Sequence, residues 1–288
     1  CKVMCAPAMD EDMWHHFTTQ RNIATLKNNG NIVLGVGAGE LASGLVGEGR
    51  MQEPEDILVE IKSCLRKENL KGQKILITSG PTHEALDPVR FIANHSTGKM
   101  GKALAEAFYE NGAEIVFITG TSAYLPVYKN IQIVHVDSAA QMYDECITYF
   151  HEASIAVLAA AVADYSPVET AVQKIKKSQE VFSLQLKKTK DILKELGRIK
   201  INQLLVGFAL ETNNELENAK KKLSEKNADL IVLNSMQDHG AGFGYDTNRV
   251  VILDKSGDKT ESNLMSKKDI ANLIVAVVEE KIKHNGND

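Results

Sequence analysis

The polar loop that runs from Ser79 to Gly101 combines residue types suited to binding an anion. It reads SGPTHEALDPVRFIANHSTGKMG and joins an apolar strand pattern, Lys74–Thr78, to a helical pattern that starts near Thr97. Open α/β sheets bind ligands at the carboxyl ends of their strands, and free N–H groups at a helix N-terminus attract phosphate. The loop therefore predicts an anion site at Ser96, Thr97 and Gly98.

Two other interpretations of this loop bear on the prediction. A Walker A loop is excluded, because Met100 follows the Gly98-Lys99 pair where Ser or Thr is required. A capping loop with Ser96 or Thr97 as the helix N-cap is an alternative that needs no ligand.

A second candidate is the segment Ala159–Lys177, in which a strand of small residues ends at Asp164 and a lysine-bearing stretch follows. Small residues let a ligand approach the backbone closely. A carboxylate at a strand end can hold ribose hydroxyls or Mg²⁺, and a lysine such as Lys174 can neutralise phosphate charge. A solvated run of charges is the alternative.

A third candidate combines Phe208, at the end of a strand, with Lys222 and Lys226 on the helix that follows. A spacing of four residues places the two ammonium groups on one helix face, where they can hold a polyphosphate. Alternatively, the lysines are exposed surface residues and Phe208 belongs to the core.

The glycine clusters and histidines give weaker signals. The stretch GAGELA (37–42) follows an apolar strand, but further glycines occupy the place of the helix, which favours a loop over a dinucleotide site. The stretch GAGFGYD (240–246) opens no helix, and the scattered histidines indicate no zinc cluster.

Apolar strand patterns alternate with helical patterns from Gln73 onward, which predicts an α/β fold with a doubly wound, mostly parallel, Rossmann-like sheet. The expected strands are Lys74–Thr78, Glu114–Thr119, Ile131–Val136, Ile155–Ala160, Leu204–Ala209, Leu230–Leu233 and Arg249–Asp254. A polar excursion between Tyr165 and Lys190, with the alternating stretch Val181–Leu186, predicts an inserted flap. The charged stretch Cys64–Gly72 predicts a domain boundary.

Composition restricts the class of protein. The 288 residues carry a net charge of −5, with no long basic stripe and no apolar run long enough to cross a bilayer. We therefore expect neither nucleic-acid nor membrane binding. The four cysteines form no CxxC pair, so reduced thiols and a cytoplasmic location are expected. The chain opens inside an apolar element without Met, so a preceding segment is expected.

The motifs GPTHEALDPVRFIANHSTGKMG, AAVADYSP…KIKK and GFALETN…KLSEKNADLIVLN together resemble the synthetase half of the bacterial phosphopantothenoylcysteine decarboxylase/synthetase family of coenzyme A biosynthesis. This resemblance covers residues 72–288. Residues 1–66 resemble the end of the family's flavin-dependent decarboxylase half, a partial flavoprotein-like α/β segment, through APAMDEDMW and GELASGLVGEGRM.

The resemblance implies that CTP and Mg²⁺ activate 4'-phosphopantothenate as an acyl-cytidylate, from which L-cysteine displaces CMP. It implies a homodimer in which the flap of one subunit closes the site of the other, and a higher oligomer for the full-length protein. The implied phosphopantothenate or anion residues are Arg90, Asn94, Ser96, Thr97, Gly98 and Lys99, with Asn94 and Lys174 catalytic. The implied CTP residues are Leu158, Ala159, Ala160, Asp164, Lys174, Asp191, Phe208, Lys222 and Lys226.

This chain departs from the family pattern at three positions. Lys190 stands where proline is commoner, beside the cytidine contact at Asp191. Asp10 replaces the usual asparagine and Ser43 the usual proton-donating cysteine of the decarboxylase half, and a hydroxyl is a much weaker acid than a thiol. The start of that half's FMN site is also missing, so we expect no decarboxylation by residues 1–66. An NAD(P)-dependent oxidoreductase or a non-catalytic nucleotide-binding module is the alternative function.

Overall fold

A computed structural model describes residues 1–122, 124–176, 183–211, 215–235 and 244–285. The chain divides into two compact units, Cys1–Arg66 and Lys67–Asp288. Each unit is described by itself. Among the described residues, no helix is both long and apolar enough to span a membrane.

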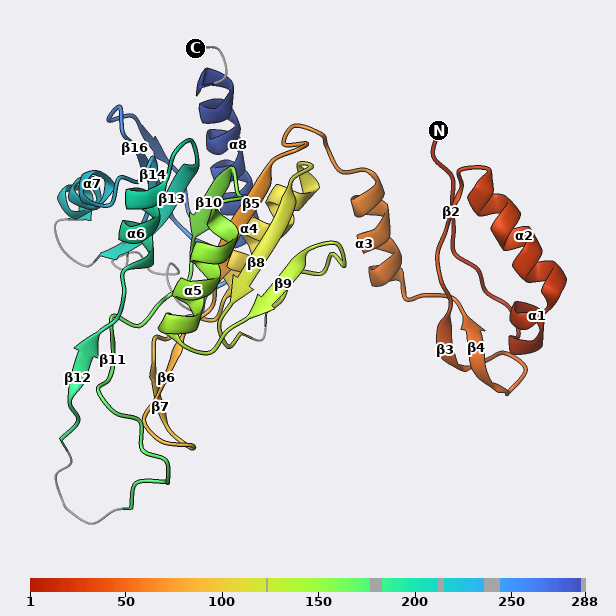
Figure 1. Ribbon diagram of the computed structural model, residues 1–288. Helices are drawn as coiled ribbons and strands as arrows, with labels where there is room; N and C mark the ends of the chain where they lie inside the picture. The colour runs from red at the N-terminus through yellow and green to blue at the C-terminus, as the bar shows by residue number, and fades with distance from the viewer. Residues whose placement is uncertain (123, 177–182, 212–214, 236–243, 286–288) are drawn as a thin grey trace. The chain divides into compact units, whose positions relative to one another are not determined.

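The larger unit is built on one eight-stranded sheet with the order β17-β16-β14-β13-β10-β5-β8-β9 (Figure 1). The strands from β14 to β9 pair in parallel, whereas β16 and β17 join antiparallel at one edge. The strand bounds are β5 (Lys74–Ser79), β8 (Glu114–Thr119), β9 (Gln132–His135), β10 (Ile155–Leu158), β13 (Leu204–Glu211), β14 (Leu230–Ser235), β16 (Val250–Asp254) and β17 (Lys259–Glu261).

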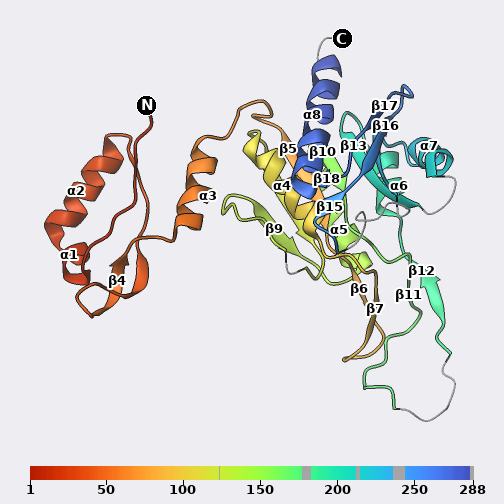
Figure 2. The same cartoon turned by 180° about the vertical axis from the view of Figure 1, so that it is seen from behind.

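Helices cover both faces of this sheet. On one face α4 (Lys99–Glu110) packs beside α8 (Lys267–Asn285), as Figure 2 also shows. On the other face, side chains of α5 (Ala139–Phe150), α6 (Ile192–Ile199) and α7 (Glu215–Glu225) share one core with the strands. Because both faces are covered, the central strands are continuous apolar runs and not alternating ones. The predicted Rossmann-like α/β fold is confirmed.

The start of α4 differs from the alternative interpretation of the loop, in which Ser96 or Thr97 caps the helix. The N-cap is Gly98, with φ of 81°, and neither Ser96 nor Thr97 takes that place. A Cβ at Gly98 would lie 2.3 Å from Ser122 Oγ, so glycine lets the loop lie directly against its neighbour. At its other end α4 has Asn111 as C-cap, and Gly112 follows with φ of 101°, a conformation that glycine adopts readily.

Two antiparallel strand pairs extend from the end of the sheet where the parallel strands finish (Figure 1). One is the hairpin of β6 (His83–Ala85) and β7 (Phe91–Ala93), and the other pairs β11 (Tyr165–Pro167) with β12 (Leu186–Lys188). The inserted excursion was therefore predicted correctly, and its returning strand begins at Leu186. Residues 177–182 lie outside the described part of the chain. A further short pair joins β15 (Thr247–Asn248) to β18 (Met265–Ser266).

The smaller unit has little buried core. Its strands β1 (Met4–Cys5) and β2 (Ile32–Val33) pair in parallel, and β3 (Gly37–Glu40) and β4 (Val46–Arg50) form a hairpin. Its helices are α1 (Glu11–His15), α2 (Phe17–Asn28) and α3 (Pro54–Cys64).

The structure corrects the expectation of a loop at residues 37–42. Residues 37–40 are strand β3, and the glycines after them turn into β4 and not into a helix. The reason lies in close contacts: a Cβ at Gly49 would lie 2.2 Å from Met9 O, so the hairpin packs too closely for side chains there.

Candidate functional site

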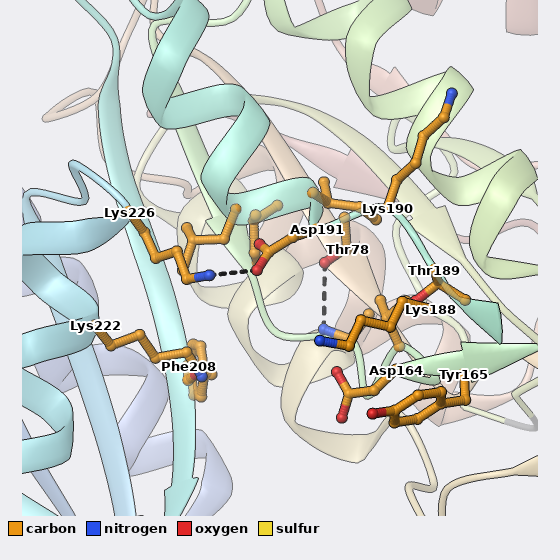
Figure 3. Close-up of a pocket in the computed structure, with 15 residues that line it drawn as sticks. Thr78, Asp164, Tyr165, Lys188, Thr189, Lys190, Asp191, Phe208, Lys222 and Lys226 are labelled. Carbon is orange, nitrogen blue, oxygen red and sulfur yellow. Dashed lines mark hydrogen bonds and ion pairs between the residues drawn. The ribbon is translucent and has the colours of Figure 1, made fainter.

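A pocket of about 520 Å³ opens at the carboxyl ends of β10 and β13, and we call it the large pocket (Figure 3). Its walls are Thr78, Leu158, Ala160, Val162, Asp164, Tyr165, Lys188, Thr189, Lys190, Asp191, Ile192, Leu193, Phe208, Lys222 and Lys226. All of the expected CTP residues except Ala159 and Lys174 lie here. Strands β10 and β13 are neighbours in the sheet, which explains why positions 50 residues apart meet.

Lys222 on α7 and Lys226, one residue beyond the end of that helix, are both held toward the large pocket. Lys222 Nζ donates to the carbonyl of Phe208 at 3.2 Å, and Lys226 forms an ion pair with Asp191. Asp191 is the N-cap of α6 and accepts from the amide of Lys194 at 2.9 Å. Burial opposes ionisation of Asp191, but Lys226 and the Lys194 amide outweigh it and leave its pKa below the ordinary value.

Lys190, the departure from the family pattern, is directed away from the labelled side chains of the large pocket (Figure 3). Its ammonium lies 4.2 Å from the centre of the Tyr143 ring on α5, a cation–π contact. This contact holds the Lys190 side chain against α5. Its ammonium group therefore points away from Asp191 and the other labelled residues of the large pocket.

A second pocket of about 140 Å³, which we call the small pocket, shares Ala160 and Phe208 with the large one. The remaining walls are Ser96, Thr97, Gly98, Lys99, Met100, Gly101, Ala159, Ala161, Ala209, Leu210, Asn234, Asn248 and Lys267. The predicted anion loop and the start of α4 therefore form one wall of a real pocket. Because the two pockets adjoin, one extended ligand can occupy both.

Two ammonium groups give the small pocket its positive charge. Lys99 Nζ lies 2.6 Å from the exposed Asp246, and this hydrogen bond raises the pKa of Lys99. Lys267 is buried and donates to the carbonyl of Tyr245 at 2.6 Å. Burial, and then the charge of Lys99, lowers the pKa of Lys267. An anion bound between the two ammonium groups would offset their mutual repulsion and would favour the charged form of Lys267.

Several pocket residues were not found from the sequence. Asn234, at the end of β14, has a buried side-chain oxygen with no hydrogen-bond partner in the described part of the chain. The position of Asn234 near the end of an apolar strand, where ligands bind in such sheets, is the sequence signal that could have identified it. Asn248 and Lys267 gave no such signal, because they come from the short β15–β18 pair and the start of α8. Of the glycines in 240–246, Gly240 and Gly242 lie outside the described residues.

Asn94 links the anion loop to the end of β10. Its side-chain amide donates to the carbonyls of Ala161 and Val162, at 3.1 Å each. Asn94 itself lines neither pocket, but its two partners do, since Ala161 lines the small pocket and Val162 the large one. Arg90 and Lys174 line neither pocket, because they belong to the hairpin and the flap that extend from the sheet.

In the smaller unit, Asp10 and Ser43 line the same pocket of about 340 Å³. Asp10 is the N-cap of α1, and Ser43 lies in the β3–β4 turn. The N-termini of α2 and α3 are poorly suited to hold an FMN phosphate. His16 already caps α2 by accepting from the Thr18 amide, and Glu55 and Asp56 in the first turn of α3 repel an anion.

No group of three or more His, Cys, Asp or Glu side chains suited to a metal gathers among the described residues. Mg²⁺ nevertheless fits the large pocket as a companion of nucleotide phosphates. It keeps several waters and needs only one or two carboxylates besides phosphate oxygens, and Asp164 is an exposed carboxylate on this wall.

Comparison with known proteins agrees with this architecture. Residues 70–282 match the family described as DNA/pantothenate metabolism flavoprotein C-terminal domain, and residues 1–66 match the flavoprotein family. The chain is 48% identical over 277 residues to a cysteine/cysteine sulfinic acid decarboxylase from an unknown prokaryotic organism, covering 94% of this chain and 77% of that protein.

It is 42% identical over 287 residues to the coenzyme A biosynthesis bifunctional protein CoaBC of Bacillus subtilis (strain 168), covering 99% of this chain and 71% of that protein. A crystal structure of the C-terminal domain of a CoaBC protein superposes with a TM-score of 0.65 at 39% identity, covering 76% of this chain and all of that domain. The chain therefore belongs to the DNA/pantothenate metabolism flavoprotein family, the phosphopantothenoylcysteine decarboxylase/synthetase enzymes of coenzyme A biosynthesis.

Proposed function

We propose that this chain catalyses the CTP-dependent ligation of 4'-phosphopantothenate to L-cysteine. The observation that carries the proposal is the pair of pockets that meet at Ala160 and Phe208. The large one offers a nucleotide the ring of Phe208, the carboxylate of Asp164 and the ammonium groups of Lys222 and Lys226. The small one offers positive charge and the N-terminus of α4 to a phosphate.

The reaction proceeds in two steps. A carboxylate oxygen of phosphopantothenate attacks the α-phosphorus of CTP, and the bond to the β-phosphate oxygen breaks to release pyrophosphate. The amine of cysteine then attacks the acyl carbon, loses a proton and displaces CMP. The protein brings two anions together, and such positioning can contribute roughly 7–11 kcal/mol to lowering the barrier.

Each residue has a role in this proposal. Lys222 and Lys226 bind nucleotide phosphates, Asp164 binds the nucleotide through Mg²⁺, and Asn94 orients the acyl group where the pockets meet. Mg²⁺, held by Asp164 and phosphate oxygens, would screen phosphate charge. The match of residues 1–66 suggests a flavin for the family's decarboxylase half, but no step is assigned to it in this chain.

We also propose that the enzyme is a homodimer in the cytoplasm. Arg90 and Lys174 lie on extensions of the sheet and line neither pocket of their own chain. A second subunit whose extensions reach across would supply both cations. The four cysteines, Cys1, Cys5, Cys64 and Cys146, are free thiols, which supports a reducing compartment.

The decisive experiment measures pyrophosphate release from CTP before cysteine is added. We expect release that requires phosphopantothenate, because the first step precedes use of the amine. Release that needs cysteine, or that proceeds without phosphopantothenate, would refute the acyl-cytidylate route. A thermal-shift comparison of CTP, ATP and NADPH separates the alternatives, since stabilisation by NADPH alone favours an oxidoreductase.

A further inference from the structure

The β6–β7 hairpin contains a buried carboxylate, Asp87, that binds the flap. The Asp87 side chain is fully buried, although it lies at the tip of an extension from the sheet. Its neighbour Arg90 is 44% exposed, so one partner is enclosed and the other faces solvent. The hydrogen bond from Arg90, assisted by backbone amides, holds the pKa of Asp87 far below its usual range.

The two oxygens of Asp87 serve different parts of the chain. Oδ1 accepts from the amides of Val89 and Arg90, at 2.8 and 2.9 Å, and so closes the hairpin turn. Oδ2 accepts from Arg90 Nε at 3.0 Å, from its Nη2, and from the amide of Ile175 at 3.1 Å. Only the second set reaches the flap.

The flap is bound to the hairpin at further points. Arg90 Nη2 donates to the carbonyl of Ile175 at 2.8 Å, so the amide and the carbonyl of Ile175 are both hydrogen-bonded to the hairpin. The amide of Ala171 donates to Leu86 O at 3.0 Å, and Thr170 Oγ1 donates to Ala85 O at 3.1 Å. Residues 170–175 therefore lie along the hairpin tip, and Lys174 directly precedes the residue bound by Asp87.

We propose that Asp87 is a positioning residue that docks the flap on the hairpin, so that Arg90 and Lys174 reach the substrates as one preformed pair. This inference rests on the proposed function for the roles of those two cations. A lysine on an undocked flap would lose conformational entropy in each catalytic cycle, whereas a docked one is already placed. Asp87 itself touches no substrate and acts through the other two residues.

The variant Asp87→Asn tests the docking selectively. An amide has one acceptor oxygen and cannot serve both the turn and the flap, yet it keeps the size of the side chain. The matched control is Glu84→Gln in the same hairpin. Glu84 is also a buried carboxylate, but it accepts from the amide of Ala139 on α5 and does not contact the flap.

Hydrogen exchange of the peptide that covers residues 168–176 is the readout independent of activity. We expect at least tenfold faster exchange in Asp87→Asn and unchanged exchange in Glu84→Gln, with both proteins folded by circular dichroism. Unchanged exchange in Asp87→Asn would overturn the docking. If that variant fails to fold, Arg90→Lys serves instead, because lysine cannot bind Asp87 and Ile175 O together, and the same acceleration is required.

Activity then tests the positioning role. We expect kcat for pyrophosphate release to fall roughly 10- to 100-fold in Asp87→Asn, with little change in KM for CTP. The double variant with Lys174→Gln should lose less activity than the two single losses multiplied together, because both changes remove the placed Lys174 and only the effect on Arg90 remains. A kcat equal to that of the wild type, or additive losses, would refute positioning. If the wild-type protein releases no pyrophosphate, the proposed function fails, while hydrogen exchange still decides the docking.

Discussion

Lys226 and Asp191 form an ion pair that joins the end of α7 to the N-cap of α6 across one wall of the large pocket (Figure 3). The pair fixes the ammonium group of Lys226 where a nucleotide phosphate would contact it. The carboxylate is half-exposed and the lysine mostly covered, so the lysine is the more restricted partner.

The variant Lys226→Met should weaken CTP binding about tenfold, because it removes one charge-assisted contact to phosphate while keeping the length of the side chain. Isothermal titration calorimetry provides the dissociation constant. Lys220→Met is the matched control, since Lys220 is exposed on α7, which ends one residue before Lys226, and lines neither pocket. Equal losses in both variants would argue against a specific contact.

The variant Asn94→Asp should accumulate the activated intermediate. A carboxylate cannot donate to the carbonyls of Ala161 and Val162, and it adds negative charge beside an anionic ligand. Pyrophosphate release should persist while turnover with cysteine falls, and mass spectrometry should detect the acyl-cytidylate. The control is Asn130→Asp, which alters a contact to Tyr109, and neither of these residues lines a pocket described above. Detecting no intermediate while release continues would contradict this role.

The variant Lys267→Met should separate stability from anion binding. It removes a buried ammonium whose pKa is lowered by burial, so the ligand-free protein should be at least as stable as the wild type. Stabilisation by 4'-phosphopantothenate in a thermal-shift assay should be lost. The exposed neighbour Lys268→Met is the control and should respond as the wild type does. Full stabilisation of Lys267→Met would exclude this lysine from the anion site.

The variant Gly98→Ala should distort the small pocket. Its Cβ would lie 2.3 Å from Ser122 Oγ, in addition to the cost of a left-handed φ. The control Gly257→Ala measures the cost of a left-handed φ alone, because Gly257 has φ of 92° and no atom lies within 4 Å of a Cβ there. In urea denaturation we expect Gly257→Ala to lose about 1 kcal/mol and Gly98→Ala roughly 1–3 kcal/mol more. Equal losses would show that the contact with Ser122 relaxes freely.

Asp229 should contribute stability that depends on pH. Burial opposes its ionisation, but Lys200, the amide of Leu205 and Lys255 outweigh burial and lower its pKa from the ordinary 3.8. The folded protein thus favours the ionised form. Its contribution is fully present above about pH 4 and is lost as the pH falls through the lowered folded pKa.

Urea denaturation of Asp229→Asn and wild-type protein measures this contribution. The difference in their free energies of unfolding should be largest near pH 7 and should shrink as the pH falls below about 4. Asp144→Asn, at an exposed site on α5, should show no such trend. A difference between wild type and Asp229→Asn that is constant with pH would contradict the linkage.

The sequence by itself determined the class of fold and much of one pocket. Apolar runs such as Ile155–Leu158 identify buried parallel strands, because their side chains are covered on both faces. Phe208 and Asp164 were identifiable because function gathers where such strands end. The cap of α4 was not, because Gly98 was selected by its contact with Ser122, which is distant in sequence.

Only the tertiary structure decided which residues meet. Lys267 completes the small pocket because α8 packs beside α4, a contact between elements more than 150 residues apart that no local pattern encodes. The sequence did not identify Asp87 for the same reason. Its proposed role depends on the hydrogen bond from the amide of Ile175, and only folding brings these two residues together. Local propensity and periodicity are properties of neighbours along the chain, whereas a binding site is a property of neighbours in space.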